Sequence, residues 1–344
     1  MRRLRILVLM HPDCVPPESN DGYSAQEKSA WKTEFDVVTT LRAAGHDVRP
    51  LGVQEEMGPV RDEIENFKPH VVYQLLEEFH YATAYDQHIA SYLELMKIPY
   101  TGCNPRGLIL ARGKDLSKTL VHHRRIAVPA FAVFPMRRKV KRPSRLALPL
   151  IVKSLTEDGS FGISQSSIVD TDEKLAERVA FIHEKIETAA IAEQYIEGRE
   201  LYVAVLGNNR LRVLPVWELK FGSMGGQGAR QIATEKAKHD PGYQERVGIV
   251  DGLAEDLAPE VTARIQRTAK RIYRTLKLDG YARIDFRLSA DGTPYFIEAN
   301  PNPEIAKSQE FATAARHDGL EYPELLHRIL TLGISRAKAG ASVG

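Results

Sequence analysis

Four polar side chains near the carboxyl end of the chain combine residue types that bind metal ions and phosphate groups. They are two carboxylates, an amide and a guanidinium: Asp285, Glu298, Asn300 and Arg283. Two carboxylates and an amide oxygen form an all-oxygen ligand set suited to Mg²⁺ or Mn²⁺, which usually also take waters and substrate phosphates. Arg283 adds a fixed fork of donors for an anion such as a phosphate or an acyl oxyanion. The alternative is a solvated face that carries an ordinary Arg–Asp pair.

A predicted β-hairpin brings these four side chains together. Two runs of strand-forming residues, 281–288 and 294–300, flank Asp291-Gly292, and this dipeptide between such runs is a strong hairpin signal. With Asp291 and Gly292 as the central turn residues, the four side chains form two cross-strand pairs on one face of the hairpin. Opposed carboxylates repel each other, so a bound cation is their natural compensation. The predicted pairs are Asp285 with Glu298 and Arg283 with Asn300.

The composition is that of an ordinary soluble globular protein. Of the 344 residues, 43% are hydrophobic and 27% are charged, which allows a sizeable core in about two or three domains. The formal net charge of +2 gives no reason to expect nucleic-acid or membrane binding. Cys14 and Cys103 provide neither a disulfide framework nor a thiolate metal site. The first apolar run, residues 6–10, is too short for a signal peptide, so we expect a buried strand and a cytoplasmic location.

Strand-like and helix-like segments alternate through residues 1–112. This alternation indicates parallel βαβ units in an open sheet. No G-x-G-x-x-G follows the first strand, so a dinucleotide-dependent hydride-transfer enzyme is disfavoured. The main predicted elements are strands at 6–10, 46–53 and 71–76 and a helix from Ser24 to Ala44.

The middle of the chain holds candidate phosphate-binding residues. Lys114 lies at the start of a predicted helix, and Lys153 ends a buried strand that leads into the glycine-bearing segment 158–163. Such a loop brings backbone N–H groups close to phosphate oxygens; a plain hairpin turn is the alternative. The basic segment 137–145 lacks interleaved aromatic residues, so we expect a solvated connection there and consider a nucleic-acid site unlikely. The glycines and lysines of residues 221–246 favour a lid that closes over an anionic substrate.

These features together resemble the ATP-grasp ligases, and within them the likeness is greatest to the D-alanine–D-alanine ligases. The resemblance covers most of the chain, including residues 98–102. It is carried by Lys114, Lys153, the segment Glu193 to Ile196, Glu200, Lys238, Arg283, Asp285, Glu298 and Asn300. It implies an α/β and α+β architecture, the ATP-grasp fold with an N-terminal parallel-sheet domain. The implied regions are an N-terminal α/β substrate domain at 1–112, a central lobe at 113–193, a C-terminal lobe with the metal site at 194–335 and a tail at 336–344.

The resemblance also implies an ATP site between the central and C-terminal lobes. Lys114 and Lys153 would hold the α and β phosphates, and Lys238 in the lid would reach the γ phosphate. Glu193 and the backbone at Ile196 would face the amino edge of adenine. The remaining implied contacts are Glu200 with the ribose, Ile151, Ile163, Tyr195 and Ile297 around the ring, and Gln194, Gly159, Ser160 and Gly162 in the adjoining segments.

The chemistry implied by the resemblance is carboxylate–amine ligation. Asp285, Glu298 and Asn300 would bind two Mg²⁺ ions, or Mn²⁺, with Glu298 bridging them. Arg283 would steady the acyl phosphate, and Lys238 would act on the transferred phosphate. ATP would phosphorylate a small carboxylate, and an amine would displace the phosphate to give a peptide or amide bond. A homodimer is a further expectation, since related ligases are often dimers.

Several positions depart from the D-alanine–D-alanine ligase pattern on the amino-acid side. Leu76-Glu77-Glu78 stands where a His-Gly pair is usual, and Glu304 stands where glycine is usual. Carboxylates near the acceptor would suit a cationic or amine-rich substrate; solvated side chains are the alternative. The sequence leaves three functions open, namely a ligase with its own substrates, an authentic D-alanine–D-alanine ligase, and an ATP-binding module without catalysis.

Overall fold

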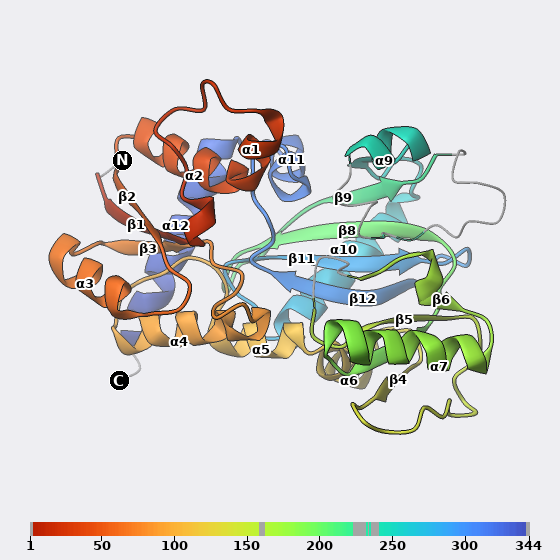
Figure 1. The fold of residues 1–344 in the computed structure, drawn as a ribbon. Helices are drawn as coiled ribbons and strands as arrows, with labels where there is room; N and C mark the ends of the chain where they lie inside the picture. Colours follow the sequence, from red (N-terminus) through yellow and green to blue (C-terminus); the bar gives the residue numbers. More distant parts are fainter. Residues whose placement is uncertain (1–2, 158–161, 223–231, 233, 235–240, 342–344) are drawn as a thin grey trace.

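The computed structural model describes residues 3–157, 162–222, 232, 234 and 241–341. These residues form three β-sheets (Figure 1). One sheet, near the N-terminus, lies at one end of the molecule, and the other two lie next to each other at the opposite end (Figure 1). In this described part of the chain, no helix is both long enough and apolar enough to cross a membrane.

The N-terminal sheet is parallel, which confirms the prediction from its alternating pattern. Its strand order is β2-β1-β3, and β1 and β3 are buried along almost their whole length. Burial on both faces explains why these strands appear in the sequence as continuous apolar runs. The elements are β1 (Arg5–Met10), β2 (Asp47–Gly52), β3 (Val71–Gln74), α1 (Ala25–Ala30), α2 (Lys32–Ala43), α3 (Gly58–Phe67) and α4 (Asp86–Leu95), with 3₁₀ turns at Pro12–Cys14 and Thr83–Tyr85.

The prediction of one unbroken helix after Ser24 is wrong, because the structure divides it into α1 and α2 at Trp31. Ser24 does cap α1: its hydroxyl accepts the Glu27 N–H, and the Glu27 carboxylate accepts the Ser24 N–H. Trp31 then leaves the helical conformation, with φ −129°, and its buried ring packs against Tyr23 and Phe35. Local aromatic packing therefore overrides the helical pattern at this point.

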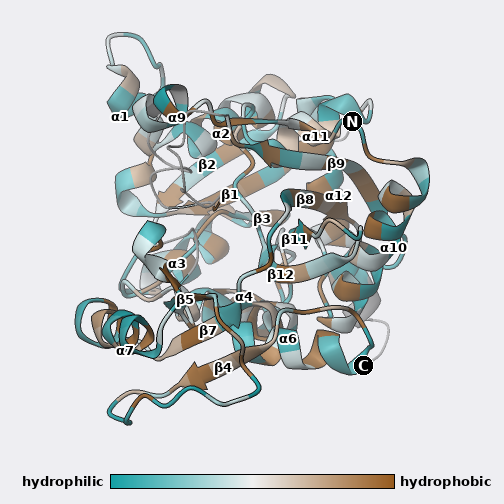
Figure 2. Ribbon diagram, turned by 90° about the vertical axis from the view of Figure 1, so that its right-hand side faces the viewer, coloured by the Kyte–Doolittle hydropathy of each residue, from teal (hydrophilic) through white to brown (hydrophobic). Residues whose placement is uncertain are grey.

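The central lobe packs an antiparallel sheet of order β4-β7-β5-β6 against α7. Figure 2 shows mainly hydrophobic residues on β4 and mixed hydrophilic and hydrophobic residues around α7. Leu175 and Val179 of α7 close the core on one face of this sheet. The elements are α6 (Lys114–His123), β4 (Phe131–Phe134), β5 (Leu150–Ser154), a 3₁₀ turn (Gln165–Ser167), β6 (Ile168–Val169), α7 (Asp172–Phe181), a π-helical turn (Ile182–Ile186) and β7 (Ala190–Gln194). The basic segment 137–145 connects β4 to β5 and is mostly exposed or half-buried.

The C-terminal lobe contains an antiparallel sheet of order β10-β9-β8-β11-β12. The amphipathic helix α10 packs against β8, β9 and β11, and α5 packs against β12. The elements are α5 (Pro105–Arg112), β8 (Arg199–Leu206), β9 (Arg212–Lys220), α9 (Pro241–Val247), β10 (Val250–Leu253), α10 (Pro259–Thr275), β11 (Tyr281–Leu288), β12 (Pro294–Pro301) and α11 (Glu310–His317).

The β11–β12 hairpin confirms the predicted side-chain pairs, whereas the predicted two-residue turn is wrong. The strands stop at Leu288 and resume at Pro294, and within this longer turn the Gly292 N–H donates to the Ser289 carbonyl. Gly292 has φ +75°, a conformation that glycine adopts without strain. The longer turn shifts the register by one residue, and a β-bulge at Ile297 shifts it back. The bulge thereby restores the pairs Asp285 with Glu298 and Arg283 with Asn300.

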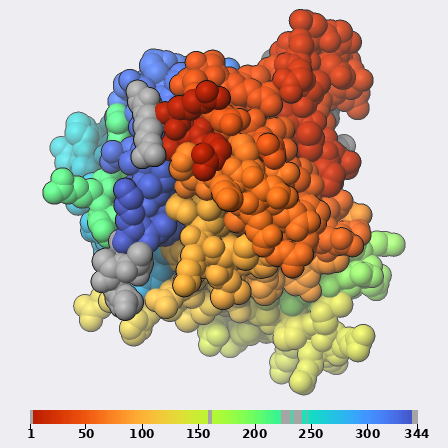
Figure 3. Space-filling view, turned by 90° about the vertical axis from the view of Figure 1, so that its left-hand side faces the viewer, coloured from red at the N-terminus to blue at the C-terminus, as the bar shows by residue number. Residues whose placement is uncertain are grey.

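The last helix, α12 (Tyr322–Ala341), packs on the N-terminal sheet. The sequence analysis expected a tail at 336–344, but the structure continues the helix to Ala341. Its apolar side chains share one core with β1 and α2, and Figure 3 shows the blue C-terminal residues directly beside the orange N-terminal ones. The α12 residues in this core include Leu325, Leu326, Ile329 and Leu330.

Arg336 fixes the end of α12 to the segment that precedes α5. Its guanidinium donates to the carbonyls of Gly102 and Tyr100 at 2.6 and 2.8 Å and lies 3.1 Å from the Asp279 carboxylate. It also lies over the Tyr100 ring, 4.0 Å from the ring centre. A single half-buried side chain therefore connects three separate segments of the chain.

Replacing this guanidinium should destabilise the protein. Arg336→Met removes charge-assisted hydrogen bonds and leaves Asp279 without its cation, so we expect the free energy of unfolding to fall by about 2–4 kcal/mol. Urea unfolding followed by circular dichroism measures the change. Arg328→Met, at an exposed position of the same helix, is the matched control. Equal stability of the two variants would contradict the role given to Arg336.

Candidate active site

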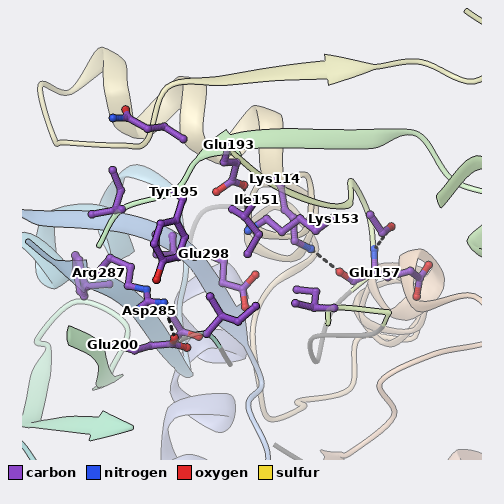
Figure 4. Close-up of a pocket in the computed structure, with 17 residues that line it drawn as sticks. Lys114, Ile151, Lys153, Glu157, Glu193, Tyr195, Glu200, Asp285, Arg287 and Glu298 are labelled. Carbon is purple, nitrogen blue, oxygen red and sulfur yellow. Dashed lines mark hydrogen bonds and ion pairs between the residues drawn. The ribbon is translucent and has the colours of Figure 1, made fainter. Parts of the chain in front are cut away.

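A cavity opens between the central sheet and the β11–β12 hairpin (Figure 4). The cavity is open to solvent, and about 800 Å³ of space lies within it and at its mouth. Figure 4 shows Lys153, Glu193 and Glu298 converging on this space from different elements. The structure brings these predicted residues to its walls: Lys114, Ile151, Lys153, Ile163, Glu193, Gln194, Tyr195, Ile196, Glu200, Asp285, Ile297 and Glu298.

Two further predicted residues, Arg283 and Asn300, are hydrogen-bonded to Asp285, which lines the cavity. The Arg283 Nε and Nη2 atoms donate to the two Asp285 oxygens at 2.8 and 2.9 Å, and the Asn300 Nδ2 atom donates to Asp285 Oδ2 at 3.0 Å. The Arg283 and Asp285 side chains are 14% and 6% exposed, so the alternative of a solvated ion pair is wrong. Gly162 precedes Ile163, and its carbonyl accepts a hydrogen bond from Arg178. Lys238, Gly159 and Ser160 lie outside the described residues.

Two lysines share one buried carboxylate beside the cavity. The Glu193 oxygens lie 3.1 Å from Lys118 Nζ and 3.0 Å from Lys153 Nζ. Burial alone would raise the pKa of Glu193, but the two ammonium groups outweigh it and lower that pKa. Burial lowers the pKa of Lys118 to about 8, although the Glu193 carboxylate acts to raise it. At Lys153, burial also acts to lower the pKa, but the carboxylates of Glu193 and Glu298 outweigh it, so the pKa is raised. At neutral pH the cluster therefore consists of one carboxylate between two cations.

Lys118 is a site residue that the sequence prediction did not include. It lies on α6 one turn after Lys114, is fully buried, and donates to the Ile297 carbonyl at 2.5 Å. Because Ile297 is the bulged residue of β12, Lys118 connects the carboxylate on β7 to the bulge that sets the position of Glu298. The signal in the sequence was the one-turn spacing of the two lysines.

Arg287 is a second residue that the prediction missed. It follows Arg283 and Asp285 at the same two-residue spacing on β11, which was the available signal. Its guanidinium lies 3.6 Å from Glu200, whose carboxylate also accepts the Tyr202 hydroxyl at 2.9 Å. These contacts hold Glu200 in place at the cavity wall. Other lining residues without a prior prediction are Ser154, Glu157, Ile232 and Phe286.

The opposed carboxylates have the chemistry of a magnesium site. The Asn300 amide nitrogen donates to Asp285. The Asn300 amide oxygen is therefore left to act as a ligand for a cation, together with Glu298. In the described ranges, no cluster of three or more His, Cys, Asp and Glu side chains forms a closed metal cage. A cation held here would complete its coordination with water and substrate phosphates, as Mg²⁺ usually does. The residues present therefore fit the expected metal.

A second cavity lies between α2, the end of β3 and the loop after β12. Its walls carry the predicted substrate-side residues Glu77, Glu78 and Glu304, and also Glu34, which the prediction missed. Burial raises the pKa of Glu34 to about 7; a backbone hydrogen bond opposes this increase, and the Glu77 and Glu304 carboxylates add to it. The carboxylates of Glu34, Glu77 and Glu304 therefore lie near one another in a cavity with limited access to water.

Comparisons with known proteins show which family the chain is similar to. The family model described as "D-ala D-ala ligase C-terminus" matches residues 120–331. A D-alanine–D-alanine ligase of Desulfotalea psychrophila is 32% identical over 259 residues, which cover 74% of this chain and 76% of that protein. One of Aquifex aeolicus is 26% identical and covers 95% of this chain and 100% of that protein. The crystal structure of the Bacillus anthracis D-alanine–D-alanine ligase superposes with a TM-score of 0.76 at 21% identity, covering 98% and 99% of the two chains.

The chain has the ATP-grasp fold. The chain belongs to the D-alanine–D-alanine ligase family. It is accordingly an ATP-dependent, ADP-forming carbon–nitrogen ligase that uses a divalent metal.

Removing the shared carboxylate should destabilise the protein more than removing an exposed one. Glu193→Gln leaves two buried ammonium groups without their anion, so we expect the free energy of unfolding to fall by about 3–5 kcal/mol. Glu197→Gln, an exposed position four residues later, is the control and should change stability by less than about 0.5 kcal/mol. Chemical denaturation at pH 7 tests this. Indistinguishable midpoints for the two variants would refute the cluster's structural role.

The raised pKa of Glu34 predicts a pH dependence of stability. Its carboxyl binds a proton more tightly in the folded chain, so this stabilisation is complete below about pH 4.5 and is lost as the pH rises through about 7. Glu34→Gln removes the loss and should raise the free energy of unfolding at pH 8 by up to about 3 kcal/mol relative to wild type. The difference should vanish at pH 4. Glu65→Gln, an exposed position on α3, should follow the wild-type curve throughout, and a Glu34→Gln curve parallel to wild type would contradict the prediction.

Proposed function

We propose that this protein joins a carboxylate to an amine through an acyl phosphate. The observation that supports this reaction is the pairing of Asp285 with Glu298 beside the buried Arg283, at the edge of the lysine-lined cavity. A carboxylate is a poor electrophile at neutral pH, and phosphorylation gives it a leaving group that an amine can displace. Arg283 keeps its charge, because the Asp285 and Glu310 carboxylates outweigh burial and raise its pKa. This fixed charge suits the acyl phosphate and the oxyanion that follows it.

The first cavity has the charge pattern of a nucleotide site. Lys114 and Lys153 would contact the phosphates, and Glu193, held by two ammonium groups, would accept the adenine amino group. Glu200 would accept ribose hydroxyls. Lys238, Gly159, Ser160 and Gly162 are proposed on the resemblance alone. The apolar walls around the ring are Ile151, Ile163, Tyr195 and Ile297.

We further propose that Asp285, Glu298 and Asn300 hold two Mg²⁺ ions, with Mn²⁺ as a substitute. Bound there, the metal would neutralise the charge that develops on the transferred phosphate. The names of the relatives make D-alanine the second substrate hypothesis, in which the product is D-alanyl-D-alanine. The regions 1–112, 113–193 and 194–335, a homodimer and a cytoplasmic location stay proposals from the sequence.

ADP release by the purified protein tests the ligase reaction. We expect release only when ATP, Mg²⁺, a carboxylate and an amine are all present, and we expect chelation of the metal to abolish it. Glu298→Gln removes one of the paired carboxylates and should lower the rate by at least about 100-fold. Glu260→Gln, at an exposed position of α10, should leave the rate unchanged.

Product mass decides between the substrates. Formation of D-alanyl-D-alanine from D-alanine alone would favour the second hypothesis. ATP binding without turnover on any carboxylate and amine in a panel of D- and L-amino acids, dipeptides and polyamines would contradict the proposed ligase.

A further inference from the structure

The two lysines paired with Glu193 have different access to the first cavity. Lys153 lines this cavity, and its ammonium group lies 3.0 Å from a Glu193 oxygen. Lys118 is 0% exposed, lies 3.1 Å from the other Glu193 oxygen, and is not among the described residues that line the cavity. Of the two ammonium groups, only that of Lys153 is therefore placed to contact a bound ligand.

The Lys118 ammonium is enclosed by the protein on several sides. It donates to the Ile297 carbonyl at 2.5 Å and lies 5.5 Å from the centre of the Phe296 ring, which is fully buried. A buried cation that moves away from its carboxylate leaves both charges uncompensated. Lys118 therefore remains next to Glu193 whether or not the first cavity is filled.

One oxygen of Glu193 is left for a ligand. Glu193 is 1% exposed and lines the first cavity. Its Oε1 atom forms an ion pair with Lys153 that lacks hydrogen-bond geometry, and it accepts no hydrogen bond from any residue that the structure describes. Buried polar atoms in folded proteins nearly always have a hydrogen-bond partner. The N–H donor of a bound ligand, such as the adenine amino group, would supply this partner.

We propose that Lys118 is a positioning residue for adenine recognition, because it holds Glu193 as an ionised acceptor for the amino group while Lys153 turns to the phosphates. The inference rests on the proposed nucleotide site and gives the two lysines different roles in it. An ionised carboxylate only accepts hydrogen bonds, so it binds a purine that carries an amino group and gains nothing from one without it. Removing Lys118 takes away the cation that fixes the charge and the position of this carboxylate.

ADP and purine riboside 5′-diphosphate form the matched pair of probes, because they differ only in the amino group of the base. Calorimetric titration of the full chain with Mg²⁺ measures both affinities. We expect the wild-type protein to bind ADP at least about tenfold more tightly. In Lys118→Met this preference should fall below about threefold, while the affinity for purine riboside diphosphate stays within about threefold of wild type and so shows that the variant folds.

Two further lysine variants serve as comparisons. Lys153→Met should weaken both nucleotides and keep the preference for ADP, because its contact is with the phosphates. Lys185→Met, at an exposed position of the π-helical turn after α7, should leave both affinities unchanged. A merely structural role of Lys118 would weaken both nucleotides by the same factor. That result, or loss of the preference in Lys153→Met alone, would overturn the proposal.

A crystal structure of the wild-type protein with ADP and Mg²⁺ tests the same inference without any variant. We expect the Lys118 ammonium to stay within about 3 Å of Glu193, and the Lys153 ammonium to contact a phosphate oxygen. A Lys118 ammonium that has left Glu193, or a Lys153 ammonium that contacts Glu193 and no phosphate, would overturn the proposal.

The wild-type titration separates this inference from the proposed nucleotide site. Equal binding of the two diphosphates by the wild-type protein would refute the adenine contact at Glu193, and the role of Lys118 would fall with it. A wild-type preference for ADP that persists in Lys118→Met would support the adenine contact and overturn the role of Lys118 alone.

Discussion

The buried carboxylate of Glu193, held between Lys118 and Lys153, is the interaction on which the architecture of the site depends. It joins helix α6, strand β5 and strand β7, and through the Ile297 carbonyl it reaches the bulge in β12. Charges taken out of water are tolerated only when each has its partner in good geometry. The elements that surround the nucleotide cavity are therefore fixed relative to one another before any ligand arrives, and so is the position of Glu298.

Charge is distributed unequally along the face of the β11–β12 hairpin. Among the described residues, two lysines, one arginine and five carboxylates line the first cavity, whereas one lysine and four carboxylates line the second. Arg283 lies on β11 between Asp285 of the first cavity and Tyr281 of the second. In the sequence, the expected departures from the D-alanine–D-alanine ligase pattern lie on the amino-acid side, whereas the paired carboxylates and the lysines resemble that pattern.

The sequence predicts the chemistry of the site better than its supporting contacts. The paired carboxylates follow from the period of two along strands, and their register is correct because an unpredicted longer turn and an unpredicted bulge cancel. Burial of Lys118 could not be predicted, since a lysine on an amphipathic helix ordinarily faces water. Glu34 was missed because Trp31 breaks the helix that contains it, and the direction of each later side chain depends on that break. Packing between distant segments decided the burial of Lys118, and local aromatic packing decided the helix break at Trp31; periodicity along a single sequence encodes neither.

The position of α12 has a consequence for how the chain is made. β1 is synthesised roughly 300 residues before α12, the helix that completes its core. One apolar face of the nascent N-terminal sheet therefore stays exposed while the other two sheets are synthesised. Contacts between such distant parts of a chain close slowly. During translation this exposed apolar surface is prone to aggregation until α12 covers it.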